Sequence, residues 1–491
     1  MAGTEIGTQL SEMASLKAEN ARLRSEVARL TAENTQLRAA LAETQAQVAS
    51  NAQRTAELER RLKQSSQNSS KPPSSDGPGV NRRKRGQSRR SRGGQNGHAG
   101  TGRKLLPVEA VSEVIDHRPT CCRGCGESLA GADENPERLQ TVEVPPIRPQ
   151  VVEHRIHSLV CRRCGTVTKA KAPEGLRGTP FGPRLHGIVA LMGGLLRLTK
   201  REIQSALDVL FGVEVGLGSI SKMERRMRAA LDAPYEAALT MIRGSPHVHQ
   251  DTMGWRQDKR RCHLWITCAE TLAYFRITPQ ANRVTAKDIL GVSFDRPVVT
   301  DRAACQTWPH QQWCWSHLLR DFEALVELPG GTWYGDRLRA SARRVHAVYA
   351  ERASGRISHA EMVSQLAPTR RAVNRLLVNA ADHAPSIRVK RVCAEILKGE
   401  AKLWTFLDHP GVPPTNNPAE RGLRKAVLWR NGSFGTDSAG GSRFVERILT
   451  VVTTLRLQQR QTDILDWLVA ARAAHVAATT PPSLLPHALT P

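Results

Sequence analysis

Residues 415–421 read Thr-Asn-Asn-Pro-Ala-Glu-Arg, and the other motifs of the chain are best understood from this one. Asparagine followed by proline is typical of a helix start, because proline lacks the N–H that the first helical turn leaves unused. We expect Asn417 as the N-cap, Pro418 at the first helical position and Glu420 at the third. The Glu420 carboxylate then either reaches back to the N–H of the cap or serves as a ligand.

Two aspartates upstream of Glu420 end predicted strands. Alternating apolar residues between short turns predict a mixed sheet in an α/β domain, with strands at 247–251, 262–269, 272–278 and 297–301. Asp251 ends the first strand and Asp301 the fourth, so their carboxylates meet if the two strands are neighbours. Joined by Glu420, they can hold two Mg²⁺ ions about 3.5–4 Å apart, although an aspartate at a strand end is also an ordinary turn residue.

The charge balance of the chain favours a polyanionic partner, most simply nucleic acid. Its 491 residues include 71 Lys and Arg against 46 Asp and Glu, a formal charge of +25. The length predicts about three domains, with enough apolar residues for a buried core. The N-terminus has no signal-peptide core, and the longest apolar stretch, 187–198, is too short to span a bilayer, so we expect a soluble intracellular protein.

Residues 6–64 keep a heptad repeat, which predicts a coiled coil. One seam position carries Leu16, Leu23, Leu30, Leu37 and Leu58. Asn20 and Asn34 occupy the other seam, where a buried amide pairs with its mate and favours a parallel dimer in register. The alternative is a single amphipathic helix packed on its own chain.

The segment 65–105 is predicted to be a disordered linker followed by a basic arm. Ser, Pro and Gly at 67–77 provide too little apolar surface to fold, and 81–104 contains no acid. The basic residues of the arm include Arg82, Arg83, Lys84, Arg85, Arg89, Arg90 and Arg92. We expect them to lie along DNA phosphates, the alternative being a solubilising tail.

Two Cys-x-x-Cys pairs predict a zinc-ribbon-like module over 106–175. The pairs are Cys122 with Cys125 and Cys161 with Cys164. Four thiolates leave no open position on zinc, which indicates a structural role. Cys121 is an alternative to Cys122, and the stretch 142–160 between the pairs is strand-like.

Residues 181–240 are predicted to be helical, with a glycine turn at 212–218 and a second helix from 219. Four cations on that helix are compatible with a helix-turn-helix that enters a DNA groove, and an ordinary helical bundle is the alternative. The cations are Lys222, Arg225, Arg226 and Arg228.

A further helical segment at about 318–407 interrupts the predicted sheet domain as an insertion. Just before it, Cys314 and His317 have the i, i+3 spacing of a metal knuckle. No second pair stands nearby in the sequence, so we expect His317 to be packed with its imidazole satisfied.

Several motifs, taken in order, resemble those of the insertion-sequence 66 family of transposases, DDE-type enzymes with a ribonuclease-H-like catalytic core. The motifs are the heptad start, 68–76, 93–100, the two Cys-x-x-Cys pairs, 314–317 and 416–421. The resemblance covers nearly the whole chain. It implies a multidomain α+β protein with the catalytic core at 245–460 and a C-terminal helix and Pro-rich tail at 461–491.

By that resemblance, Asp251, Asp301 and Glu420 fall on the family's metal-binding triad, which implies Mg²⁺ or Mn²⁺ there and Zn²⁺ in the cysteine module. The aspartates are followed by Thr252-Met253 and Arg302-Ala303, where the family usually has Glu-Thr and Gly-Tyr. This departure concerns substrate contacts rather than the acids.

We therefore expect a dimeric or larger DNA transposase of the bacterial cytoplasm, associated with the nucleoid. It cleaves the ends of an insertion sequence and transfers the freed strand to target DNA, with companion proteins of the same element as further partners. Arg421, Arg424 and Lys425 are expected to hold phosphates. The rival hypothesis is a non-catalytic DNA-binding protein, either a regulator or an inactive transposase remnant.

Overall fold

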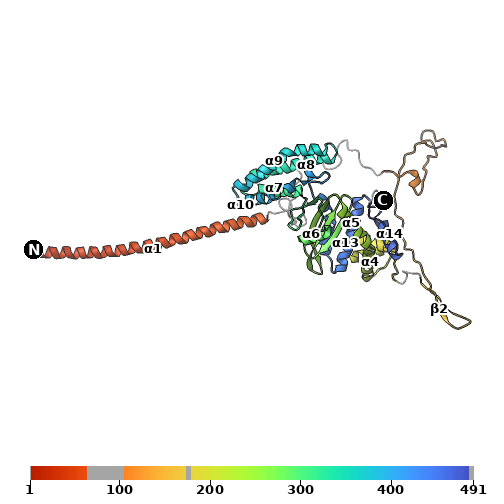
Figure 1. Ribbon diagram of the computed structural model, residues 1–491, viewed down its shortest axis with the longest axis horizontal. Coiled ribbons are helices and arrows are strands. Elements are labelled where there is room, and N and C mark those ends of the chain that lie inside the picture. Colours follow the sequence, from red (N-terminus) through yellow and green to blue (C-terminus); the bar gives the residue numbers. More distant parts are fainter. Residues whose placement is uncertain (1, 63–103, 173–177, 486–491) are drawn as a thin grey trace.

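The computed structural model describes residues 2–62, 104–172 and 178–485. The N-terminal helix α1 (Ala2–Leu62) extends as a rod from a body of helices and strands, and residues 104–172 form extended arms at the opposite end (Figure 1). The predicted mixed α+β composition is confirmed. The linker and basic arm predicted over 65–105 lie outside the described residues, except for Lys104 and Leu105.

Five strands form a mixed sheet in the order β5-β4-β3-β6-β7. They are β3 (Val248–Gln257), β4 (Arg260–Cys268), β5 (Ala273–Thr278), β6 (Val298–Thr300) and β7 (Gln311–Trp313). The first three are antiparallel neighbours, while β6 runs parallel to β3 and β7 parallel to β6. Four of these strands are predicted from the sequence, and β7 is missed because three residues are too few to show alternation.

Helices cover both faces of the sheet. The covering helices are α5 (Asp232–Gly244), α6 (Arg283–Leu290), α12 (Asn417–Ser433) and α13 (Ala439–Leu457). Trp265 of β4 packs in the core on the side of α5 and α6, and its neighbours Leu264 and Ile266 pack in the core on the side of α12 and α13. Successive residues of a strand point to opposite faces, so one strand contributes to both cores.

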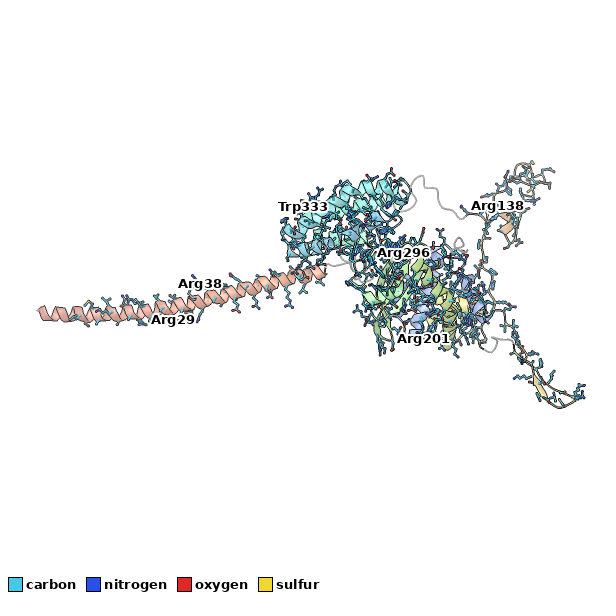
Figure 2. The ribbon with its side chains drawn as sticks, viewed as in Figure 1. Arg29, Arg38, Arg138, Arg201, Arg296 and Trp333 are labelled. Carbon is cyan, nitrogen blue, oxygen red and sulfur yellow. The ribbon has the colours of Figure 1, made fainter. Side chains whose placement is uncertain are left out.

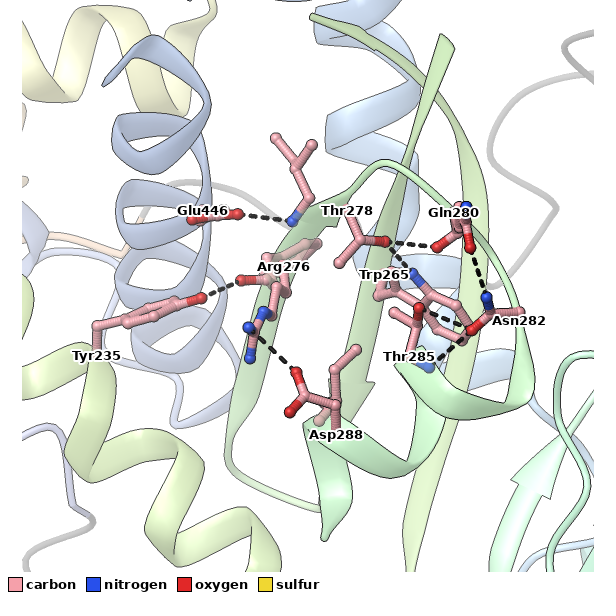
Figure 3. Close-up of polar contacts among 12 residues, drawn as sticks. Tyr235, Trp265, Arg276, Thr278, Gln280, Asn282, Thr285, Asp288 and Glu446 are labelled. Carbon is pink, nitrogen blue, oxygen red and sulfur yellow. Dashed lines mark hydrogen bonds and ion pairs between the residues drawn. The ribbon is translucent and has the colours of Figure 1, made fainter. Parts of the chain in front are cut away.

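The outer strand β5 is closed by polar side chains of α13. The N–H groups of Ala273, Phe275 and Ile277 donate to Thr454 Oγ1, Thr450 Oγ1 and Glu446 Oε1 over 3.1, 3.0 and 2.7 Å. Residues four apart lie on one side of a helix, so these three acceptors form a row that matches alternate N–H groups of the strand. Figure 3 shows Glu446 of α13 and Tyr235 of α5 reaching β5 from the helices beside it. The row satisfies donors that an edge strand would otherwise expose.

The helical region before the sheet is confirmed as helical. Its elements are α2 (Pro183–Leu191), the π-helical η3 (Met192–Leu196), α3 (Lys200–Phe211) and α4 (Leu217–Ala230). Helix α4 begins two residues before the predicted start, directly after the turn that Gly212 opens in the left-handed conformation. Helices α2, α4, α13 and α14 (Ile464–Val476) share one core.

Helices also occupy the predicted insertion between β7 and α12. They are α7 (Trp315–Val326), α8 (Thr332–Ala353), α9 (His359–His383), α10 (Ile387–Leu397), the 3-10 turn η4 (Glu400–Leu403) and α11 (Thr405–Asp408). They enclose a core that also includes Val299 of β6. The indole N–H of Trp315 donates to the Leu403 carbonyl over 2.8 Å and ties the first helix to the last part of the insertion.

The segment that carries the four predicted zinc ligands has little regular structure. The 3-10 turn η2 (Val108–Ala110) precedes a hairpin of β1 (Ser158–Val160) and β2 (Val167–Lys169). The strand predicted over 142–160 is wrong except for its last three residues. Pro145, Pro146 and Pro149 explain this, because a proline has no N–H to donate to a neighbouring strand.

Helix α1 leaves its apolar seam uncovered. The leucines at 16, 23, 30, 37 and 41 are between 50% and 65% exposed. Figure 2 shows the side chains of α1, Arg29 and Arg38 among them, projecting into open space along most of the rod. Near its C-terminal end, Arg388 of α10 contacts Glu57 over 2.8 Å. The arrangement is not that of a helix packed along its own chain.

Candidate metal and nucleic-acid site

The register of the sheet places Asp251 beside Asp301. Strands β3 and β6 are parallel, with Val248 opposite Val298 and His249 opposite Val299. Continuing this register by two residues sets Asp251 opposite Asp301, where β6 has just ended. The two strands are therefore neighbours, which is the condition for the two carboxylates to meet.

Both aspartates are held in an environment that disfavours their negative charges. Burial raises the pKa of Asp251 well above its usual range, and the nearby charges of Asp301 and Glu420 raise it further. Burial also raises the pKa of Asp301. Each carboxylate accepts one local backbone hydrogen bond, from Thr252 N to Asp251 Oδ1 over 2.7 Å and from Ala303 N to Asp301 Oδ1 over 2.9 Å.

Helix α12 starts one residue earlier than predicted, and its first turn is anchored by Asn416. The N-cap is Asn416 rather than Asn417, and Asn416 is fully buried. Its side-chain N–H donates to the Gln250 carbonyl over 3.1 Å, its Oδ1 lies 3.2 Å from His249 Nδ1, and its backbone N donates to Cys314 Sγ over 3.1 Å. Asn416 therefore ties the start of α12 to β3 and to the residue that follows β7.

Because the helix begins at Asn417, Glu420 stands at its fourth position and does not cap it. The carboxylate points instead towards α7. Glu420 Oε1 lies 3.4 Å from His317 Nδ1, and Oε2 lies 3.7 Å from a guanidinium nitrogen of Arg320. Burial raises the pKa of Glu420, and Asp301 adds to this effect while Arg320 opposes it.

His317 is not the satisfied imidazole that the sequence leads us to expect. Its Nδ1 and Glu420 Oε1 are both buried and both lack a hydrogen-bond partner. Burial, with the charges of Arg320 and Arg302, lowers the pKa of His317 to about 4, so the ring is neutral near pH 7. Ligand atoms of Cys314, His317 and Glu420 lie within 4.8 Å of one another, a cluster formed by residues about 100 positions apart.

These residues fit a divalent cation. The charges of Asp301 and Glu420 raise the pKa of Asp251, and the charge of Asp301 raises the pKa of Glu420. A bound cation offsets this kind of repulsion. Two buried atoms on the Glu420 side have no partner among the described residues. Oxygen ligands suit Mg²⁺ and Mn²⁺, while the neighbouring imidazole and thiol suit softer metals. Burial raises the pKa of the Cys314 thiol to about 11, so without a metal it is protonated.

Arginines around the acids have two kinds of surroundings. Arg302, which directly follows Asp301, pairs with Asp321 of α7 and lies over the Trp313 ring at 5.8 Å. Arg421 and Arg424 of α12 are exposed, and Lys425 is half-buried. The predicted phosphate contacts of α12 thus lie at the surface, beside a site whose own arginines already have partners.

Each predicted zinc pair forms the same tight turn. In the first, Cys122 N donates to Glu127 O and Gly126 N to Cys122 O, over 2.8 and 2.9 Å. In the second, Cys161 N donates to Thr166 O and Gly165 N to Cys161 O, over 2.9 and 2.8 Å. By position in the turn, Cys122 is the counterpart of Cys161, whereas Cys121 pairs in an extended bridge with Ser128.

The two turns favour thiolates but are not brought together. Hydrogen bonds from the backbone N–H groups of Cys125 and Gly124 lower the pKa of Cys122. A hydrogen bond with Thr166 lowers the pKa of Cys164. Within the part of the chain that the structure describes, the four cysteines do not converge on one point.

Two of the four predicted groove contacts on α4 are engaged within the protein. Arg226 donates to the Gly178 carbonyl, and Arg228 donates to the Gly440 carbonyl over 3.3 Å. Lys222 and Arg225 are exposed. The basic-arm residues lie in the stretch 63–103, outside the described residues: Arg82, Arg83, Lys84, Arg85, Arg89, Arg90 and Arg92. None of the helices in the described ranges has the length and apolar character of a membrane span.

Comparison with known families adds three matches. Residues 198–443, about half of the chain, match the family described as Transposase IS66 family. Residues 119–165 match the zinc-finger binding domain of transposase IS66, and residues 10–104 match a family of unknown function. No match is found among curated proteins.

Proposed function

Because the chain belongs to the IS66 transposase family, we propose that it binds the ends of an insertion sequence and performs Mg²⁺-dependent strand cleavage and strand transfer. The family makes it a DNA-processing protein with a zinc-finger domain. The metal dependence, the catalytic residues and the two chemical steps are our proposal.

The observation that supports the proposal is the electrostatic influence of Asp301 and Glu420 on Asp251. The acids come from three separate elements, and the charges of Asp301 and Glu420 both raise the pKa of Asp251. A protein gains no stability from gathering buried like charges, and such sites are typical of metal binding and catalysis.

The side chains have separate tasks in the proposed reaction. Asp251, Asp301 and Glu420 hold the divalent cations, which when bound stabilise the attacking and leaving oxygens of an in-line displacement. Asn416 fixes the start of α12 against β3, and so sets where Glu420 stands. Arg320 holds the other carboxylate oxygen of Glu420. Water attacks a phosphodiester at the element end, and the freed 3′-hydroxyl then attacks target DNA without a covalent protein intermediate.

We assign the remaining parts to recognition and assembly. Zinc held by Cys122, Cys125, Cys161 and Cys164 requires the two turns to come together, and we propose that metal binding drives this. The exposed leucine seam of α1 supports a coiled-coil dimer, and the mixed five-stranded sheet supports a ribonuclease-H-like core. Leu23→Asp with Leu30→Asp should give a monomer, and an unchanged sedimentation coefficient would rule out the coiled coil.

Nick mapping tests the proposed activity. The full-length, zinc-loaded protein is incubated with DNA ends of its own element, with Mg²⁺ in one set of reactions and without added Mg²⁺ in the other. Nicks at the element boundary that need Mg²⁺, with end binding unaffected by the omission of Mg²⁺, are expected. Binding without nicks under every metal condition would instead favour a non-catalytic DNA-binding protein.

A further inference from the structure

A hollow of about 230 Å³ opens where β4, α12 and α13 meet. This is several times the volume of about 30 Å³ that one water takes up in the liquid. Its floor includes Ile266 and Cys268 of β4, and its polar lining is Arg421, Lys425, Thr453 and Arg456. Gly422 of α12 lines the hollow as well, and it allows the helix to approach Ile266 closely.

The lining is one-sided in charge. It contains three cations and no carboxylate. Lys425 is half-buried there, and burial together with the nearby charges of Arg456 and Arg197 lowers its pKa to about 8. A cation held close to other cations gains from an anion placed between them. This differs from Arg302 and Arg320, which already contact carboxylates of the chain.

Thr453 provides an independent sign of a missing partner. Its hydroxyl is buried and has no hydrogen-bond partner in the described parts of the chain, although the residue lines the hollow. Buried hydroxyls in proteins nearly always have partners, because leaving one unpaired is unfavourable. An oxygen of a bound anion would accept the Thr453 proton.

The hollow lies next to the three acids. Ile266 is directly opposite Asp251 in the β3–β4 pairing, so the two side chains share the face that α12 covers. Neighbouring strands are about 4.8 Å apart. Glu420 and Arg421 are consecutive on α12, one at the acids and the other at the hollow.

From this placement we propose that the hollow binds one backbone phosphate of the DNA strand, adjacent to the phosphate that is cleaved. Arg421, Lys425 and Arg456 neutralise it, and Thr453 donates a hydrogen bond to it. The site fixes the register of the strand across the acids. This inference rests on the proposed function, because it takes the acids as the place of cleavage.

Neutral-phosphate scanning tests the site without requiring cleavage. End DNA is prepared with single methylphosphonates at successive positions, and its affinity for the full-length, zinc-loaded protein is measured without added Mg²⁺. For the wild type, one position next to the cleavage site should lower affinity about 10- to 100-fold, as expected for charge-assisted hydrogen bonds. Lys425→Gln with Arg456→Gln should bind more weakly and no longer distinguish that position.

Two variants control the experiment. Arg371→Gln removes an exposed charge of α9 and should leave the scan unchanged. Thr453→Val removes the unpaired hydroxyl, so it should weaken binding at the sensitive position while leaving the unfolding midpoint the same or higher. A variant that merely disturbed packing would lower the midpoint.

The outcomes separate this inference from the proposed function. Two results would overturn the phosphate site even if Mg²⁺-dependent nicking occurs. One is a wild-type scan with no sensitive position beside the acids. The other is a Lys425→Gln, Arg456→Gln protein whose affinity profile is identical to that of the wild type. A sensitive position without nicking would support the site and count against catalysis.

A second experiment measures how far bound end DNA, or inorganic phosphate, protects Lys425 from acylation. Protection by DNA is expected, and protection by inorganic phosphate alone would overturn a strand site.

Discussion

Glu420 Oε1 lies 3.4 Å from His317 Nδ1, and neither atom has a hydrogen-bond partner although both are buried. The contact joins α12 to α7, and Arg320 on the same face of α7 reaches the other carboxylate oxygen. The insertion helices therefore help to set the orientation of Glu420, which the sheet alone does not.

His317→Ala should reduce Mg²⁺-dependent end cleavage by about 10- to 100-fold while end binding is retained, since groups that orient a metal ligand typically contribute this much. His317→Gln should recover part of the rate, because an amide N–H can donate to Glu420. His310→Ala, at an exposed position after β6, is the control. Cleavage by His317→Ala within twofold of wild type would show that the contact has no role.

Alanine at position 422 should stabilise the protein only if Ile266 is also replaced by a smaller residue. A Cβ at position 422 would lie 2.2 Å from Ile266 Cδ1, while one at Gly432 of the same helix meets nothing within 4 Å. Alanine in a helix gains up to about 1 kcal/mol over glycine, and overpacking costs about 1–3 kcal/mol. Gly432→Ala should therefore stabilise, and Gly422→Ala should be neutral or destabilising.

The same contact predicts a coupling that urea unfolding can measure. Ile266→Val removes Cδ1, so the double variant Gly422→Ala, Ile266→Val should be about 1–2 kcal/mol more stable than the sum of the single variants. Strict additivity would mean that α12 moves away from β4 without strain.

The stability of the protein should depend on pH through Glu446. Burial raises its pKa to about 7, and the N–H of Ile277 and nearby arginines only partly offset this. A raised carboxyl pKa stabilises the fold fully below the unfolded value of about 4.5, and this contribution is lost as pH rises towards 7. The difference, about 2.5 units, corresponds to roughly 3 kcal/mol.

Glu446→Gln keeps an acceptor for Ile277 N and removes this dependence. The difference in free energy of unfolding between Glu446→Gln and wild type should grow in favour of the variant from pH 4.5 to pH 7. At pH 8 the variant should still be the more stable protein. Glu236→Gln, an exposed residue of α5, should show no such trend. Parallel curves for the wild type and Glu446→Gln would contradict the raised pKa.

The first zinc pair should depend on Cys122 and not on Cys121. The turn at Cys122 repeats the turn at Cys161, while Cys121 sits in an extended bridge. Cys122→Ser should lose about one equivalent of zinc, as should Cys161→Ser, because zinc binding and folding of small modules are linked. Metal analysis in which Cys121→Ser loses the zinc and Cys122→Ser keeps it would reverse the assignment.

What the sequence predicts well is local. Each Cys-x-x-Cys turn and the helices at 181–240 depend on residues close together in the chain, and they are found where expected. The stretch 142–160 shows the limit of such patterns, since its prolines prevent the pairing that its apolar residues suggest.

The surroundings of the acids are not predictable in this way. Asp251 and Asp301 meet only because β6 joins β3, which no local pattern specifies. Asn416 is buried among β3 and Cys314, and His317 faces Glu420, through contacts that span more than 100 residues. For Glu420 the sequence leaves a capping role and a ligand role open, and its neighbours His317 and Arg320 come from the folded insertion.

The most direct test of the account is Mg²⁺-dependent cleavage of end DNA by Asp251→Asn, measured together with its unfolding midpoint. Removing a buried negative charge should raise the midpoint, whereas cleavage should fall by about 10³-fold or more, equivalent to the several kcal/mol that a metal site contributes. Asp258→Asn, an exposed residue at the β3–β4 turn, should match wild type in both. Cleavage by Asp251→Asn within a few-fold of wild type would contradict the claim that Asp251, Asp301 and Glu420 form the metal site.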